Sequence, residues 1–176
     1  STVVRLKGGD PFIFGRGGEE IAALEEAAID WEVVPGITAA VGAAASIGLP
    51  LTHRDYAQAV TFVTAHRRAG VLDVDWSLVT RPNQCVVFYM ATSVATELVT
   101  QLISHGCCGM RKLTVVADAT TDKEAIEEYT LSEFAEAPQP VRAPAILILH
   151  DAPIVGSSAD ARAEDVIEPG VLVETL

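Results

Sequence analysis

Short, almost continuous apolar runs stand out after residue 59. Runs of this kind are typical of β-strands that are covered on both faces of a sheet. They predict strands over residues 60–65, 85–90, 113–117 and 145–150, with a further strand over 126–131. Because Glu127 and Glu128 interrupt the apolar pattern of that further strand, we expect it at an edge of the sheet.

Stretches with helical periodicity lie between and before these runs. Residues 18–30 begin with two glutamates that complement the helix dipole, which predicts a helix there. Residues 38–47 are almost all small, so a helix over this range would pack closely against another element. A third helix is predicted over 92–105, with Gly106 as its C-terminal cap. We expect Ser132 to cap a further, short helix.

The first part of the chain twice shows an apolar run that ends in a glycine-containing turn and is followed by a helix. The apolar runs are residues 3–6 and 31–34, and we predict a strand for each. The first run leads into GGDP at 8–11, and the second leads into PG at 35–36. Open α/β sheets place their ligands where strands end and helices begin. These two turns are therefore candidate parts of a binding site.

A polar, irregular stretch over residues 51–59 separates the first part of the chain from the longer second part. The predicted fold class is α/β, in two layered pieces that meet near this stretch. We expect the first domain over residues 1–55 and the second over 56–155. Residues 156–176 are acidic, and we expect them to form a flexible tail.

The composition indicates a folded protein and limits the kinds of ligand that we expect it to bind. The chain has 176 residues, of which 49% are hydrophobic, and a net charge of −12. Residues 118–176 carry 13 of the 24 acidic side chains and 3 of the 12 basic ones. Nucleic acid is not an expected partner, because binding its phosphates needs a basic face. A small anionic ligand would depend on local Arg and His side chains.

Several sequence features indicate a cytoplasmic location. No apolar run reaches the roughly 18 residues needed to span a bilayer, so no membrane partner is expected. The N-terminus shows no charged leader followed by an apolar core. The 3 cysteines do not form a disulfide framework, which favours a reducing compartment. No CxxC or HxxxH spacing indicates a metal site, and none is predicted.

Each candidate site residue also has an ordinary structural interpretation. The GGDP turn either holds a polar ligand with its amides and the Asp10 carboxylate, or is a plain strand-to-helix turn. Thr38 either caps the following helix or binds a ligand. His53 and Arg54 either bind carboxylates or lie on a surface loop. Met90, at the end of an apolar run, is usually core filler.

Taken in order, five segments carry a family resemblance. They read RLKGGDPFIFGRGGEE, EVVPGITAA, GLPLTHRDYA, VTFVTAH and VVFYM, and together cover nearly all of residues 3–105. The chain resembles the tetrapyrrole methylases. Within them it is most similar to the uroporphyrinogen-III C-methyltransferases, which also form the methylase part of siroheme synthases. The forms GGDPFIFGRGGEE and PLTHRDYA favour this branch over the precorrin methylases.

The resemblance implies a fold and an activity. Members of the family consist of two α/β domains with S-adenosylmethionine in the cleft between them, and they are usually homodimers. They methylate ring carbons of uroporphyrinogen III, which gives precorrin-2 for siroheme and cobalamin. Because the family has a further segment before RLKGGDP, the resemblance implies a truncated first domain and a complete second domain here.

The resemblance also implies roles for individual residues. The implied cofactor-binding residues are Gly8, Gly9, Asp10, Ile13, Thr38, Ala39, Met90 and Ala119. The substrate carries several carboxylates, and the implied anchors for them are Arg16, His53 and Arg54, with Arg67 as a further candidate. The acid and base residues that the family uses for proton transfer belong to the segment before RLKGGDP, so no catalytic residue is named.

Three places depart from the family pattern, and one of them is His150-Asp151 at the last strand, where relatives favour Gly-Glu. Ala91 follows Met90 where the family has Gly. Ala119 stands where the family tends to have the Gly of a Gly-Thr pair, and an Ala there could block a backbone approach or a left-handed conformation. Two alternatives stay open, namely a non-catalytic interaction or dimerisation module with this fold, and a precorrin methyltransferase.

Overall fold

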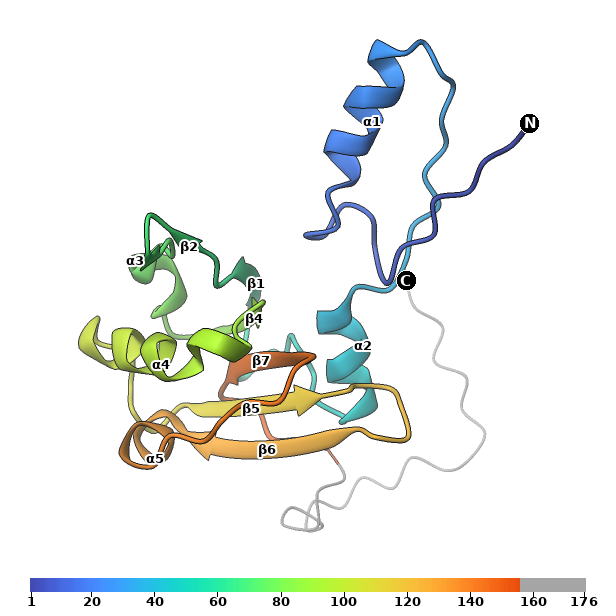
Figure 1. Cartoon of the computed structure of the whole chain (residues 1–176). Helices are drawn as coiled ribbons and strands as arrows, with labels where there is room; N and C mark the ends of the chain where they lie inside the picture. The colour runs from blue at the N-terminus through green and yellow to red at the C-terminus, as the bar shows by residue number, and fades with distance from the viewer. Residues whose placement is uncertain (156–176) are drawn as a thin grey trace, which may run out of the picture.

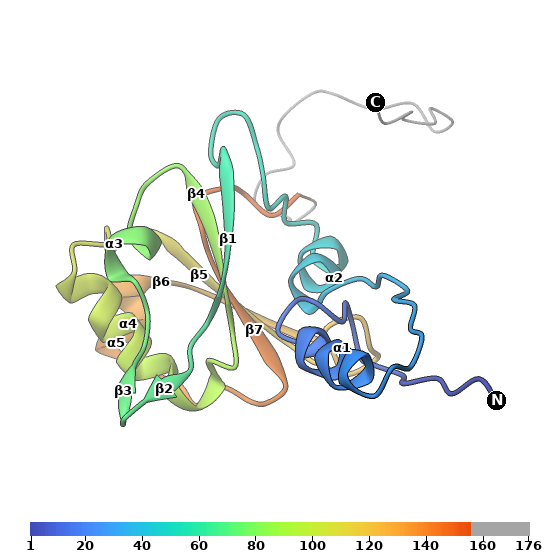
Figure 2. The ribbon, with the colours of Figure 1, turned by 90° about the horizontal axis from the view of Figure 1, so that it is seen from above.

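A five-stranded mixed sheet forms the centre of the computed structural model, which describes residues 1–155 (Figures 1 and 2). Its strands are β1 (Ala59–Thr64), β4 (Gln84–Tyr89), β5 (Lys112–Ala117), β6 (Ala125–Thr130) and β7 (Ala145–His150). They lie in the order β1-β4-β7-β5-β6. β1 and β4 pair in parallel, whereas the other pairs are antiparallel. β1, β4 and β5 therefore run in the same direction, and their carboxyl ends lie on one side of the sheet. We call this side the carboxyl edge, as distinct from the edge strands β1 and β6.

Helices cover both faces of this sheet (Figure 2). One face carries α3 (Trp76–Val79), η1 (Thr92–Val94), α4 (Ala95–Ser104) and α5 (Leu131–Glu136), and the other carries α2 (Ala39–Ser46). A small separate hairpin consists of β2 (Arg67–Arg68) and β3 (Val71–Leu72). In β4, Phe88 joins the core beneath α4 and α5, whereas Val87 and Tyr89 join the core beneath α2. β4 is buried along its whole length, as predicted for a strand covered on both faces.

The structure confirms the elements predicted for the later half of the chain. Each observed strand of the large sheet begins and ends within one residue of its predicted range. β6 lies at an edge of the sheet, as its glutamates indicate. The helix predicted over 92–105 is present as η1 followed by α4, and Gly106 is left-handed, as expected just after a helix.

The predicted cap of α5 is wrong. Thr130 rather than Ser132 is the N-cap residue, because its hydroxyl accepts a hydrogen bond from the N–H of Glu133 at 3.1 Å. The Glu133 carboxylate in turn accepts a bond from the N–H of Thr130 at 2.7 Å. This reciprocal capping box has the sequence form Thr-x-x-Glu, so the signal was present in the sequence.

Residues 1–37 differ from the sheet in having one regular element. This element is α1 (Gly17–Glu26), which is shorter than the helix predicted over 18–30. The strands predicted over 3–6 and 31–34 are wrong, since neither segment has strand structure. A strand needs a hydrogen-bonded neighbour, and the described residues supply none beside either segment.

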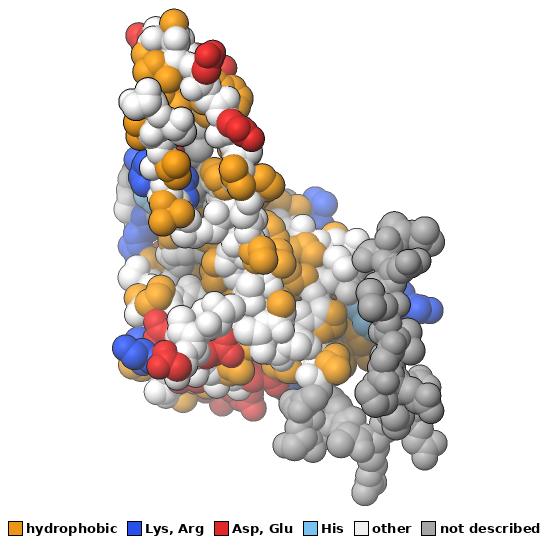
Figure 3. All heavy atoms as spheres, turned by 90° about the vertical axis from the view of Figure 1, so that its right-hand side faces the viewer, with side chains coloured by type: hydrophobic (Ala, Val, Ile, Leu, Met, Phe, Trp, Pro, Cys, Tyr) orange, Lys and Arg blue, Asp and Glu red, His pale blue; other side chains and the backbone are white. Residues whose placement is uncertain are grey.

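Apolar side chains of this first region lie on the surface. Val3, Val4 and Leu6 are 87%, 81% and 84% exposed. The other large apolar side chains exposed before residue 42 are those of Phe12, Phe14, Ile29, Trp31, Val34, Ile37 and Val41. Figure 3 shows apolar side chains gathered along the part of the molecule that projects from the sheet.

The α/β fold class is confirmed, and α2 links the first part of the chain to the sheet. Ala40, Ala43 and Ile47 are buried in the core between α2 and the sheet. The domain division after residue 55 stays a prediction, and the predicted acidic tail over 156–176 lies outside the described residues. Within residues 1–155 no helix is long and apolar enough to cross a membrane, and no group of His, Cys, Asp and Glu side chains is placed to hold a metal ion.

Candidate functional site

The two glycine-containing turns, GGDP and PG, pack directly against each other. The Asp10 carboxylate accepts hydrogen bonds from the backbone N–H of Gly36 at 3.1 Å and of Phe12 at 2.9 Å. These bonds, chiefly the one from Gly36, hold the pKa of Asp10 below its usual value. A Cβ on residue 36 would lie 2.5 Å from the carbonyl oxygen of Gly9, so glycine is required there. Asp10 thus joins the two turns by accepting from backbone amides of both segments.

The joined turns lie beside the N-terminus of α2, where Tyr89 makes an unexpected contact. Thr38 is the N-cap residue of α2, but its side chain does not cap the helix. Its hydroxyl is instead hydrogen-bonded to the hydroxyl of Tyr89 at 2.6 Å, and Tyr89 accepts a bond from the N–H of Ala40 at 3.0 Å. Sequence reasoning missed Tyr89, whose one signal was its place before Met90 in an apolar strand.

A hollow of about 680 Å³ lies along α2, and we call it the α2 hollow. It is lined by Ile37, Thr38, Ala39, Val41, Gly42, Ala43, Ala45 and Ser46, and by Ala119 and Thr120 of the loop after β5. Its size falls in the range of roughly 300–1,000 Å³ that is usual for ligand pockets. Three of the implied cofactor-binding residues, Thr38, Ala39 and Ala119, therefore meet in one hollow although they come from separate segments.

Several residues at the carboxyl edge have left-handed backbone conformations. Met90 follows β4 with φ of 55°, while Asp118 and Thr120 follow β5 with φ of 46° and 67°. Such conformations are costly for residues other than glycine and cluster at functional sites. Met90 is 57% exposed, so its interpretation as core filler is wrong. Ala119 is not left-handed, so the conformational conflict expected there does not arise.

The remaining implied cofactor-binding residues lie close to the same place. Ile13 packs against the core cluster that contains Tyr89 and Ala40. A Cβ on Gly9, which has φ of 125°, would lie 3.8 Å from the Cα of Thr38. A Cβ on Gly8 would meet nothing within 4 Å, so the backbone of this residue faces open space. The structure therefore groups the glycine turns, α2 and the carboxyl edge.

The implied substrate anchors are not grouped in this way. Arg16 is the left-handed N-cap residue of α1, and its exposed guanidinium pairs with Glu19 at 3.2 Å. His53 and Arg54 lie in the loop before β1, next to the amino ends of β1 and β4, whereas Met90 lies beyond their carboxyl ends. His53 accepts a hydrogen bond from the N–H of Asp55 at 3.1 Å, which stabilises the turn.

Arg67, the further candidate, lies on the carboxyl-edge side, in the hairpin that follows β1. Its guanidinium donates to the carbonyl oxygen of Gly70 at 3.1 Å and is paired with the Glu97 carboxylate. A second hollow of about 470 Å³ lies beside it, at the beginning of η1 and α4. Arg67 does not line the α2 hollow, and its guanidinium is paired with Glu97 instead.

Comparison with known proteins decides the family. A family model described as Tetrapyrrole (Corrin/Porphyrin) Methylases matches residues 1–135. The chain belongs to the tetrapyrrole methylases. It is 51% identical over 149 residues to a siroheme synthase of Chromobacterium violaceum, and 52% identical over 134 residues to that of Nitrosospira multiformis. These matches cover 84% and 76% of this chain but 32% and 28% of the relatives, so the chain spans about a third of their length.

Solved structures agree with this membership. A uroporphyrin-III C-methyl transferase from Thermus thermophilus, complexed with S-adenyl homocysteine, matches with a TM-score of 0.74 and 37% identity. The match covers 84% of this chain and 62% of that one. A cobalt precorrin-4 methyltransferase matches with a TM-score of 0.70 and 25% identity, over 80% of this chain and 60% of that one. The tetrapyrrole methylase fold predicted from the sequence is therefore confirmed.

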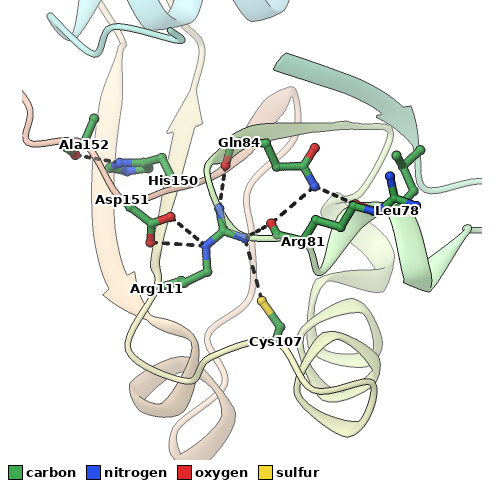
Figure 4. A network of polar contacts seen from close by, with 8 residues as sticks. All are labelled: Leu78, Arg81, Gln84, Cys107, Arg111, His150, Asp151 and Ala152. Carbon is green, nitrogen blue, oxygen red and sulfur yellow. Dashed lines mark hydrogen bonds and ion pairs between the residues drawn. The ribbon is translucent and has the colours of Figure 1, made fainter. Parts of the chain in front are cut away.

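A separate polar cluster lies at the other edge of the sheet, by the amino ends of β4 and β5 (Figure 4). Arg111 is buried and donates to the carbonyl oxygens of Gln84 at 2.6 Å and of Arg81 at 3.3 Å. Its Nε atom also lies 3.1 Å from the Asp151 carboxylate. These bonds tie the segments before β4 and β5 to the end of β7. The cluster therefore supports the sheet rather than the α2 hollow.

Burial disfavours the charged form of two titratable groups near this edge. His150 is bonded to the Thr114 hydroxyl at 2.8 Å and to the carbonyl oxygen of Ala152 at 2.8 Å. Burial lowers the pKa of His150. Burial raises the pKa of Cys85 to about 12, which disfavours the reactive thiolate form.

Proposed function

We propose that this chain is part of an S-adenosylmethionine-dependent C-methyltransferase that converts uroporphyrinogen III into precorrin-2. The observation that carries the proposal is the α2 hollow, where Thr38, Ala39 and Ala119 meet beside the joined turns. The similarity to siroheme synthases and to a uroporphyrin-III C-methyl transferase supports the reaction and its substrate. The activity would belong to the whole protein, in the cytoplasm and as a homodimer.

The groups around the hollow fit the parts of the cofactor. Small, apolar side chains along α2 leave room for an adenine ring and exclude water from it. The Asp10 carboxylate has about four lone-pair positions, and two of them accept from the N–H groups of Gly36 and Phe12. The remaining positions can accept from cofactor hydroxyl or amine groups. The open backbone of Gly8 can be approached closely. When bound, the cofactor supplies a methyl group on a positively charged sulfur.

Met90 and Ile13 complete the proposed cofactor wall. Met90 projects from the carboxyl edge, and Ile13 lies between the GGDP turn and the α2 core. Both side chains are apolar and would exclude water from the sulfonium and the reacting ring carbon. Holding the two reactants in this way is the contribution that the chain's own residues make to the rate.

The substrate anchors are proposed from their charge. Arg16 is adjacent to the joined turns, and a substrate carboxylate would compete with Glu19 for its guanidinium. His53 and Arg54 lie at the other end of β1, at a distance of roughly 20 Å for a six-residue strand. A ligand that contacts both places must therefore extend along the sheet, which a large tetrapyrrole with carboxylates around its rim is suited to do.

Calorimetric titration of the chain with S-adenosylhomocysteine tests the cofactor site. We expect micromolar binding, and we expect Gly42→Leu to weaken it at least about tenfold, because this side chain would fill the α2 hollow. Ala22→Leu on the exposed side of α1 is the matched control and should bind as the parent does. Failure of the parent chain to bind, or equal binding by Gly42→Leu, would contradict the proposed site.

Methyl transfer tests the reaction. Labelled S-adenosylmethionine and uroporphyrinogen III are supplied to the whole protein, and the label is followed into the tetrapyrrole. The account predicts a methylated product at the oxidation level of precorrin-2. Labelling of a precorrin but not of uroporphyrinogen III would favour the precorrin methyltransferase alternative, which the cobalt precorrin-4 methyltransferase match supports.

The exposed apolar side chains of residues 1–41 favour a second candidate function, a non-catalytic interaction or dimerisation module. Large exposed apolar patches mark interaction sites in soluble proteins. This candidate predicts concentration-dependent self-association in sedimentation experiments without binding of S-adenosylhomocysteine. Micromolar binding of that ligand would argue against it.

A further inference from the structure

The side chain of Tyr89 lies where three segments of the candidate site meet. Its hydroxyl contacts the N-terminus of α2 through Thr38 and Ala40. Its ring centroid lies 4.7 Å from that of Phe14, which follows the GGDP turn, and 6.0 Å from that of Phe62 in β1. Tyr89 is 8% exposed, so these contacts are made inside the protein.

The hydroxyl of Tyr89 replaces an ordinary helix cap. An N-cap threonine usually accepts a hydrogen bond from the N–H two or three residues later. In α2 the N–H of Ala40, two residues after Thr38, is bonded to Tyr89 instead. The phenol oxygen accepts from Ala40 and can still donate its own proton to Thr38. The first turn of α2 is therefore fastened to the end of β4, in addition to the backbone bonds that the Thr38 carbonyl oxygen accepts from Val41 and Gly42.

This attachment lies directly beside the α2 hollow. Thr38 and Ala39 line this hollow, and they directly precede Ala40 in the chain. Met90, the next residue after Tyr89, turns into the left-handed conformation at the carboxyl edge. One hydroxyl thus connects the two sides of the candidate site, namely the end of β4 and the start of α2.

We propose that Tyr89 is a positioning residue, whose hydroxyl holds Thr38 and the first turn of α2 in the geometry that ligand binding requires. It acts through Thr38 and the backbone of Ala40, and makes no contact with the ligand. The proposal deepens the proposed function, on which it rests for the identity of the ligand. The attachment of α2 can be measured without any ligand.

Tyr89→Phe is the test, because it removes one oxygen and keeps the ring that packs against Phe14. We expect hydrogen exchange of the Ala40 amide to accelerate at least about tenfold, with little change for the sheet amides of Val87 and Val116. Affinity for S-adenosylhomocysteine should fall about tenfold. Tyr129→Phe is the matched control, since that hydroxyl bonds Glu127 at 3.0 Å on the edge strand β6, and it should change neither value.

Each outcome separates the two proposals. Unchanged Ala40 exchange in Tyr89→Phe overturns the positioning role, and so does faster exchange throughout the sheet, which would show a general structural role. Weaker binding with unchanged Ala40 exchange would make Tyr89 a direct ligand contact and would also overturn it. Local acceleration at Ala40 together with a parent chain that binds no S-adenosylhomocysteine supports the attachment and refutes the proposed function.

Discussion

Residues 1–37 and the sheet formed by residues 59–150 contain similar apolar runs but bury them very differently. Leu6 in the first region is 84% exposed, whereas Leu147 in β7 is fully buried. β4, β5 and β7 are covered by helices on both faces, while α1 buries one glycine. The difference lies in the neighbours, because the strands of the sheet pair with each other and residues 3–6 and 31–34 pair with nothing among the described residues.

This comparison shows that an apolar run encodes a strand only together with its partners. Backbone hydrogen bonds and burial come from adjacent segments, so one sequence pattern has two outcomes. The candidate site lies between the two regions. Its turns come from the first region and its carboxyl edge comes from the sheet, so changes in either region should affect it differently.

The largest expected effect comes from removing a core side chain of the sheet. Phe88 is fully buried, and Phe88→Ala should lower the free energy of unfolding by about 3–5 kcal/mol. Phe12 is 57% exposed, so Phe12→Ala should change the free energy of unfolding by less than about 0.5 kcal/mol. Both values are measured by urea unfolding in a Trp31→Phe background. Trp76 is then the one remaining of the 2 tryptophans, and its fluorescence reports on the sheet region. Equal losses in both variants would break the comparison.

A smaller effect is expected where the two glycine turns touch. In Gly36→Ala the new Cβ would lie 2.5 Å from the carbonyl oxygen of Gly9, which forces the turns apart. We expect affinity for S-adenosylhomocysteine to fall at least about tenfold, with a cost in this contact of about 1–3 kcal/mol. Gly18→Ala, whose Cβ meets nothing within 4 Å, is the matched control for the calorimetric titration. A loss of affinity in Gly18→Ala alone would assign the ligand to another surface.

A pH-dependent effect is expected at His150, which belongs to the sheet region. Burial lowers the pKa of this residue from 6.5, so the unfolded chain takes up a proton more readily than the folded chain. Its contribution to stability is therefore present above pH 6.5 and is lost as the pH falls below this value. Urea unfolding between about pH 5 and 7 should show a shallower pH slope for His150→Gln than for the parent.

The exposed His66 provides the control for this prediction. It lies just beyond β1, outside the polar cluster at the other edge of the sheet. His66→Gln should keep the slope of the parent chain. A slope that changes equally in both variants would contradict the role of burial at His150.

The smallest expected effect is a gain in stability at α2. Gly42 lies inside this helix, and a Cβ there would make ordinary contacts with Thr120 at 3.8 Å and Ile37 at 3.9 Å. Gly42→Ala should therefore raise the free energy of unfolding by about 0.5–1 kcal/mol. Urea unfolding measures the gain, and a loss of stability would show that α2 is packed more tightly around this position than the structure indicates.

The sheet region was predictable because its signals are local. Continuous apolar runs predicted β4, β5 and β7, and the two glutamates in β6 predicted its position at the edge. The prediction of Ser132 as the cap of α5 was wrong, although Thr130 and Glu133 carry the recognisable capping-box pattern. The first region was predicted wrongly, because its apolar runs were interpreted without knowing whether a partner strand was present.

The site was predictable in part. The family resemblance named Thr38, Ala39 and Ala119, which line the α2 hollow, but local patterns could not show that they meet there. Tyr89 was missed because its hydroxyl contacts residues about 50 positions earlier in the chain, and no local pattern indicates such a bond. The exposure of Met90 was also unpredictable, since it depends on a left-handed turn after β4.

Hydrogen exchange with and without S-adenosylhomocysteine tests the central claim most directly, namely that the ligand site lies between the glycine turns, α2 and the carboxyl edge. The account predicts that the ligand slows exchange in residues 8–13, 37–43 and 118–121, and leaves residues 53–57 unchanged. Protection confined to residues 53–57, or no protection at a ligand concentration well above micromolar, would contradict it.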